Sequence, residues 1–197
     1  MANKIKYGIK NVYYAVATIG SDNTATFGSP VALPGAVSLT LDQESNENIF
    51  YADNIAYFQT FSNNGYSGSL ELALIPDAFR TDVLGEITDN KAVLVENQGA
   101  MGAHFALLFQ FEGDVNATKH VVYNCTASRP SLTGTTKEEN IEPQTETINL
   151  TATSIHVAAI DKDIVKAHTG VSTDATTYSG WFSAVYVPAG LPAATTT

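Results

Sequence analysis

Charged side chains are scarce in this sequence. Asp, Glu, Lys and Arg together make up 15% of its 197 residues, whereas about a quarter is usual for a soluble domain. Ser, Thr, Asn and Gln must therefore supply much of the polar surface, and a Thr-rich chain with many aromatic residues is typical of β structure. Basic residues are the scarcest, since ten of them stand against twenty acids and leave a formal net charge of −10. A protein that reads duplex DNA needs many Lys or Arg side chains on phosphates, so the composition disfavours that class.

Cysteine and long apolar runs are nearly absent as well. Cys125 is the only cysteine, so no internal disulfide can form, and its alternation with Val121 and Tyr123 indicates a small core residue. No run approaches the roughly 18 apolar residues of a membrane span. A signal peptide has an apolar segment after its basic residues, and the opening MANKIKYGIK has none. We therefore expect a protein made and assembled in the cytoplasm, with no membrane partner.

Alternation of apolar and polar residues dominates the chain and predicts a mainly β fold. No Pro-, Gly- or Ser-rich linker divides the sequence, so we expect a single domain over 1–187 and a flexible tail over 188–197. The predicted strands lie within 5–15, 36–42, 69–75, 104–112, 119–128, 145–153 and 181–187.

Helical spacing is found in one segment. Phe79, Val83 and Ile87 recur every four residues, which predicts a helix over about 76–87. A second, shorter helix is possible over 161–168.

The segment 43–65 joins two predicted strands and mixes Asn, Glu and Gln with five aromatic residues. It is too aromatic for a disordered linker, so we interpret it as a long hairpin or arm that projects from the sheet. Such an arm cannot bury its aromatic side chains alone, and we expect a neighbouring molecule to cover them. The alternative is an arm folded back on its own domain. The aromatic residues are Phe50, Tyr51, Tyr57, Phe58 and Phe61.

Some strands have a second face that is only half polar. Ala106, Leu108 and Val122 would be unusual in open water. Either a neighbouring subunit or a helix or loop of the same chain could cover them, and the pattern leaves both open.

No motif of catalytic, metal or cofactor chemistry is found, so we predict a protein that is not an enzyme and has no cofactor. A nucleophile elbow and a phosphate-binding loop are both missing. His104 and His120 could face each other across a hairpin, but two histidines without a third ligand are a weak case for zinc. The acidic run 42–47 lacks the glycine of a calcium loop. The acids of 131–146 indicate a solvated loop rather than a catalytic carboxylate pair.

Three stretches resemble the major tail proteins of long-tailed bacteriophages, of the phi13 type: MANKIKYGIKNVYYAVAT, LALIPDAFRTDVLG and WFSAVYVP. The order of features along most of the chain is similar too. The resemblance implies a β-sandwich or half-barrel with one flanking helix and a long projecting hairpin arm. It also implies that six subunits close into a ring and that rings stack into the tail tube, the conduit through which phage DNA enters the host.

Roles for single residues follow from this resemblance. The aromatic residues of the arm would bridge to the adjacent ring, and acids on the milder strand faces would line the lumen, although each of them could equally face water outside. Other expected partners are a tape measure protein in the lumen, tail-tip and tail-terminator proteins, and DNA in transient, non-specific passage. The candidate lumen acids are Asp42, Glu44, Glu71 and Glu112. The candidate stacking contacts, which would meet acidic surface on a neighbour, are Lys4, Lys6 and Lys10.

Two other classes of function remain open. A monomeric β-sandwich binding module, such as a capsid decoration, an adhesin or a carbohydrate-binding domain, would use the aromatic residues as an exposed binding face. An enzyme would need a carboxylate pair that the motifs do not reveal. The oligomeric state separates the first alternative from a tube subunit.

Overall fold

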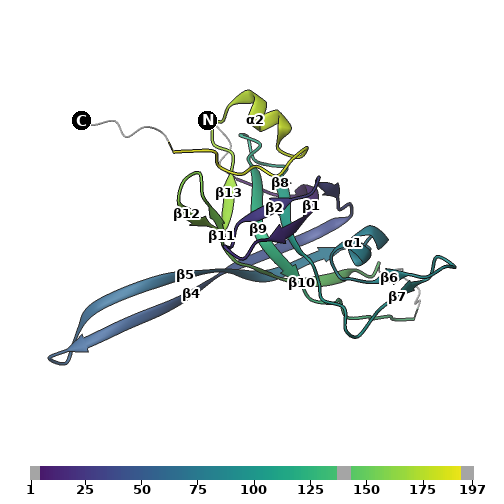
Figure 1. The fold of residues 1–197 in the computed structure, drawn as a ribbon, viewed down its shortest axis with the longest axis horizontal. Coiled ribbons are helices and arrows are strands. Elements are labelled where there is room, and N and C mark those ends of the chain that lie inside the picture. The colour runs from purple at the N-terminus through teal and green to yellow at the C-terminus, as the bar shows by residue number, and fades with distance from the viewer. Residues whose placement is uncertain (1–4, 137–142, 192–197) are drawn as a thin grey trace.

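The structure is a computed structural model that describes residues 5–136 and 143–191 (Figure 1). Lys4 and residues 192–197 of the predicted tail lie outside the described residues. The described chain is mainly β, as the alternation predicts, with two short helices. The strands are β1 (Ile9–Ile19), β2 (Ala25–Phe27), β3 (Val31–Ala32), β4 (Ala36–Ala52), β5 (Ile55–Leu72), β6 (Ile87–Thr88), β7 (Leu94–Val95), β8 (His104–Phe111), β9 (Lys119–Ala127), β10 (Glu146–Ala152), β11 (Ile155–Val157), β12 (Lys162–Ile164) and β13 (Lys166–His168).

One large antiparallel sheet forms most of the molecule. Its strand order is β2-β1-β8-β9-β10-β5-β4, with β3 added to β1 and β13 added to β9. β1 and β4 are far apart in this order and yet lie in contact. The sheet therefore curls into a half-barrel, which agrees with the expected fold class.

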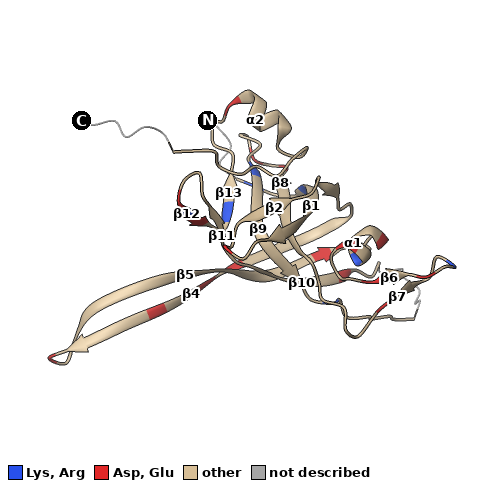
Figure 2. Cartoon of the chain, in the orientation of Figure 1, with Lys and Arg blue, Asp and Glu red and all other residues tan. Residues whose placement is uncertain are grey.

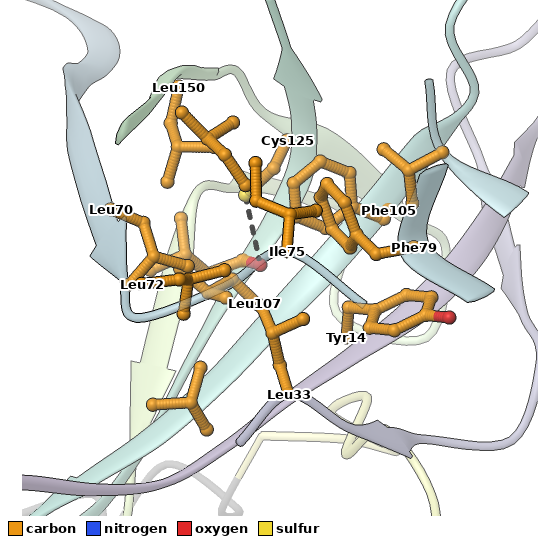
Figure 3. Close-up of a cluster of buried hydrophobic side chains, with 14 of the residues drawn as sticks. Tyr14, Leu33, Leu70, Leu72, Ile75, Phe79, Phe105, Leu107, Cys125 and Leu150 are labelled. Carbon is orange, nitrogen blue, oxygen red and sulfur yellow. Dashed lines mark hydrogen bonds between the residues drawn. The ribbon is translucent and has the colours of Figure 1, made fainter. Parts of the chain in front are cut away.

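The inside of the half-barrel holds the first of two hydrophobic clusters (Figure 3). Phe105 and Leu107 of β8 point into it, together with Leu70 and Leu72 of β5. The short helix α1 (Asp77–Asp82) closes it through Phe79.

A second cluster covers the outer face of β8 and β9. Ala106 and Leu108 belong to it and are covered by segments of the same chain, including Trp181. Val122 instead lies in the first cluster, because the pairing of β8 with β9 shifts register between Phe105 and Leu107. For these half-polar faces, the cover comes from within the chain rather than from a neighbour.

The predicted helix over 76–87 is too long. α1 has six residues, after which Gly85 takes a positive φ of 74° and Ile87 begins β6. Phe79 and Val83 are buried as their spacing predicts, but the glycine ends the helical path soon after them.

Two predictions near the C-terminus are wrong. The predicted strand 181–187 is not a strand, because the chain there follows α2 (Ala175–Gly180) into a turn and an extended tail. Trp181, Phe182 and Val185 pack on the second cluster, and their spacing of one and three residues does not fit a strand face. The possible helix over 161–168 is replaced by β12 and β13.

The predicted hairpin arm is confirmed. β4 and β5 pair over 17 and 18 residues, and their outer halves project away from the half-barrel (Figure 1). Asp53 and Asn54 form the turn with positive φ values of 53° and 61°, which matches the right-handed twist of the two strands.

Glycine is required at the root of the hairpin. A Cβ atom on Gly68 would lie 1.9 Å from the Thr40 carbonyl oxygen, and one on Gly65 would lie 2.0 Å from that of Ala152. The backbone of the hairpin therefore approaches neighbouring backbone so closely at these two positions that neither has room for a side chain.

Candidate assembly surface

The outer hairpin exposes the five aromatic side chains that the sequence singles out. No described part of the chain covers them, and Ile55 at the tip is 61% exposed as well. The exposed fractions are 61% for Phe50, 64% for Tyr51, 73% for Tyr57, 60% for Phe58 and 67% for Phe61.

Both faces of the outer hairpin carry aromatic residues. Directly paired residues of two strands share a face, so Phe50 and Phe58 lie together on one face. Phe61 is paired with Glu47 and lies on the other face, as does Tyr51 four residues further along β4. Folding one face of the arm onto its own domain would thus leave the opposite aromatic residues in water.

The whole hairpin lacks basic residues. Between residues 36 and 72 there are five acids and no Lys, Arg or His, and β4 and β5 carry only acidic colour in Figure 2. The acids are Asp42, Glu44, Glu47, Asp53 and Glu71.

Three of the four candidate lumen acids share one face at the root of the hairpin. Ser38 pairs with Glu71, Asp42 with Ser67 and Glu44 with Gly65, and all lie opposite the core face. The same face continues on β10 through its pairing with β5. Its members are Ser38, Thr40, Asp42, Glu44, Ser67, Ser69, Glu71, Thr147, Asn149 and Thr151.

Hydrogen bonds hold two of the three acids of this face, Glu71 and Glu44, in place. The Glu71 carboxylate accepts from the Ser38 hydroxyl at 2.8 Å and from the Thr145 hydroxyl at 2.6 Å. These bonds lower the pKa of Glu71. The Ser67 hydroxyl donates to Glu44. The face is therefore a hydroxyl layer with fixed negative charges.

Glu112 is not on this face. It follows β8, which lies three strands away from β5 in the sheet order, and its N–H donates to the Gly8 carbonyl at 2.8 Å. The structure thus brings Asp42, Glu44 and Glu71 together and leaves Glu112 apart.

The described lysines at the N-terminus occupy different places. Lys6 lies with its Nζ 4.7 Å from the centre of the Phe111 ring. Lys10 is exposed on β1, opposite Gln110 of β8.

A cavity of about 380 Å³ opens at the root of the hairpin, which sequence reasoning missed. The Nζ of Lys166 lies 4.5 Å from the centre of the Tyr66 ring at this site. None of the described residues that line the cavity carries a carboxylate. Its lining residues come from six segments that are distant in sequence, so no local pattern could have revealed it. They are Lys6, Leu39, Thr40, Leu41, Tyr66, Phe109, Phe111, His120, Val121, Val122, Lys166 and Ala167.

His120 adds no positive charge to this cavity near neutral pH. Its ring stacks on Phe109 with centroids 5.1 Å apart and an interplanar angle of 10°. Burial, then the neighbouring His168 and Lys6, lowers the pKa of His120 to about 4. The positive charge at the cavity thus comes from Lys6 and Lys166.

His104 and His120, which could have faced each other across a hairpin, do not do so. His120 pairs with Phe109 across the β8–β9 ladder, whereas the Nδ1 of His104 lies 2.6 Å from the Asn124 side-chain oxygen. Within residues 5–136 and 143–191, no three His, Cys, Asp or Glu side chains gather in a way that could hold a metal ion. None of the helices in these ranges has the length and apolar character to cross a membrane.

Comparisons with known proteins give no family. No protein-family model matches the sequence, and no curated protein matches it. One similar solved chain belongs to the anti-feeding prophage (AFP) baseplate, from a 6-fold symmetrised cryo-EM structure. The match covers 87% of this chain and 99% of that one, with 11% identity and a TM-score of 0.46. At this TM-score the likeness says nothing of the function.

Proposed function

We propose that this protein is a structural subunit that assembles head to tail into stacked six-membered rings, forming the tail tube of a long-tailed phage. The observation that carries the proposal is the outer hairpin, whose five aromatic side chains are 60–73% exposed. The resemblance of the sequence to major tail proteins suggests stacked rings as the form of the assembly. The exposed aromatic side chains of the hairpin give a physical reason for subunits to associate.

The exposed aromatic area is large enough for a protein interface. Aromatic side chains bury roughly 150–250 Å² each, so five of them exposed to about two thirds leave roughly 500–800 Å² in water. A standard interface buries about 800 Å² on each partner. Soluble monomers seldom expose so large an apolar area unless it is a binding surface for another molecule.

The arm also explains why the assembly would continue rather than stop at a dimer. An arm that docks at a different site on the next copy makes a heterologous contact. Such contacts close into a ring where the rotation allows it, and repeat along a tube where it does not. The subunit would be its own main partner.

The acid and hydroxyl face at the hairpin root suits the wall of a DNA conduit. Asp42, Glu44 and Glu71 would repel phosphates there and leave DNA free to slide. Glu112 lies apart from that face, so we do not assign it to the lumen. The tape measure protein would fill the lumen before DNA passes, and tail-tip and tail-terminator proteins would close the ends. Assembly would take place in the host cytoplasm and the product would be part of the virion.

Electron microscopy of the purified, concentrated protein tests this proposal. We expect rings or hollow tubes of uniform width in negative stain. The matched control joins Glu44 to Gly65 through an Asn-Gly turn, which removes the outer arm and keeps the root, and this variant should remain folded and monomeric.

Monomers at every concentration, also after a tail-tip complex is added, would contradict the proposal. That outcome would favour the monomeric binding module. Tyr51 and Tyr57 would then be the first residues to replace in a screen for sugar binding.

A further inference from the structure

The cavity at the hairpin root combines aromatic walls with positive charge. Lys6 and Lys166 lie over the rings of Phe111 and Tyr66 at 4.7 and 4.5 Å, and no acid is found among the described residues that line the cavity. Its volume of about 380 Å³ falls within the range of roughly 300–1,000 Å³ that is typical of binding pockets. It would therefore accept an apolar or aromatic group that carries a negative charge beside it.

The tip of the hairpin has this chemistry. Residues 50–58 contain five aromatic or large apolar side chains, each at least 60% exposed, and one acid, Asp53. Glu47 lies on the same arm, just before these residues, and the hairpin has no basic residue that would oppose Lys6 and Lys166.

The tip cannot reach the cavity of its own chain. Tyr66 lines the cavity and pairs with Gln43, so the cavity marks the root of the arm. The turn lies about ten residues further along the strands, which corresponds to about 30 Å at roughly 3.3 Å per residue. A tip that enters such a cavity must therefore belong to another copy.

We propose that the hairpin tip, Phe50–Phe58, of one copy docks at the cavity lined by Tyr66, Phe111, Lys6 and Lys166 of a second copy. This inference rests on the proposed function and names the receiving site within it. Aromatic residues of the tip fill the space between Tyr66 and Phe111, and Asp53 lies near the two ammonium groups. Each subunit then has one tip and one cavity, so every contact leaves a free tip and a free cavity for the next copy.

The two lysines act chiefly on encounter. Complementary charge accelerates association and selects the register, while truncation of a charge at the rim of an interface changes mainly the association rate and its dependence on salt. Aromatic docking in the cavity then holds the contact, since buried aromatic anchors are typical of interface hot spots.

Photo-cross-linking of the full chain tests the receiving site. A photoreactive benzophenone side chain replaces Phe58, the concentrated protein is irradiated, and the joined peptides are identified by mass spectrometry. We expect links between the tip of one copy and the peptides that carry Tyr66, Phe111 or Lys166 of another. Mixing isotope-labelled and unlabelled protein distinguishes links between copies from links within one chain.

Two other outcomes separate this inference from the proposed function. Rings or tubes whose tip links map elsewhere on the second copy would overturn the docking site and leave the tube subunit intact. Monomers without any link between copies would overturn both.

A charge reversal provides an independent measurement. Lys166→Glu should slow assembly on the order of tenfold at low salt, with a smaller effect at high salt. The matched control is Lys162→Glu on β12, which makes the same change of charge at an exposed position outside the cavity. Equal slowing by both variants would mean that net charge matters and the cavity does not.

Discussion

The root and the outer half of the β4–β5 hairpin are built from the same two strands but differ in burial and in the number of neighbouring strands. Leu70 and Leu72 at the root are 1% and 0% exposed, and β5 pairs there with both β4 and β10. In the outer half, β5 pairs with β4 alone, and Phe58 and Phe61 are 60% and 67% exposed. The same alternation thus serves a core at one end and an uncovered surface at the other.

This difference shows what a third strand and a half-barrel contribute. A two-stranded hairpin is at best marginally stable in water, and further strands or a covering layer are needed for independent stability. The root has both, and the outer half has neither. The aromatic side chains of the outer half therefore contribute little to the folding of the monomer, as expected if they serve the contacts between copies that we propose.

Amide hydrogen exchange of the monomer should show this contrast most strongly. We expect residues 45–63 to exchange about a thousandfold faster than the amides of β8 and β9, because opening a two-stranded arm costs far less than global unfolding. Mass spectrometry of peptides measures it. Exchange in 45–63 as slow as in β8 would contradict an arm that waits for a partner, and slowing in assembled material alone would support it.

Truncation at the two ends of β5 should separate folding from assembly. Leu70→Ala removes a buried side chain from the core cluster and should lower the free energy of unfolding by about 3–4 kcal/mol. Phe58→Ala should change it by no more than about 0.5 kcal/mol and should prevent assembly. Urea denaturation measures the first effect and light scattering the second. A destabilised Phe58→Ala monomer would mean that the arm packs on its own domain after all.

The close backbone approach at Gly68 can be tested with one methyl group. Gly68→Ala places a Cβ atom 1.9 Å from the Thr40 carbonyl oxygen, and we expect a loss of about 2–3 kcal/mol because backbone atoms must move. Ser62→Ala in the outer arm is the matched control and should be nearly neutral. Equal stability of Gly68→Ala and the wild type in urea would show that the hairpin leaves the half-barrel without this close approach.

Local patterns predicted the fold class and the arm well. Alternation identified the strands that meet in the half-barrel, and the aromatic content of 43–65 indicated a projecting hairpin. The prediction failed where burial, rather than periodicity, decides the conformation. Trp181 and Phe182 have high strand propensity, yet they follow a short helix, and in this conformation their side chains pack on the second hydrophobic cluster.

The candidate site was predicted only in part for a related reason. The shared face of Asp42, Glu44 and Glu71 follows from alternation on one hairpin, so sequence reasoning could group them. Glu112 and the cavity with Lys166 depend on how distant strands meet, and such long-range pairing leaves no local signal.

The mouth of the half-barrel, where root and arm meet, should respond to pH through His120. Burial first, then the neighbouring His168, Lys6 and Lys166, lowers the pKa of His120 to about 4 from its ordinary 6.5, although Asp114 acts in the opposite direction. The folded state therefore prefers the neutral imidazole.

The sign of the effect follows from proton binding. Below pH 6.5 the unfolded chain takes up a proton at His120 that the folded chain does not, so stability falls as the pH drops from about 6.5 to about 4 and levels off below that. His120→Phe retains a ring on Phe109 and removes the titration. We expect its free energy of unfolding to lose about 1 kcal/mol less than that of the wild type over this range, after a discount for solvent screening of a partly exposed group. Acidic groups titrate in both proteins and cancel in the difference, so parallel urea titrations at pH 7 and pH 4.5 isolate His120. An unchanged difference between the two proteins at both pH values would place His120 in water, and the cavity at the hairpin root would then be more open than its stacked rings imply.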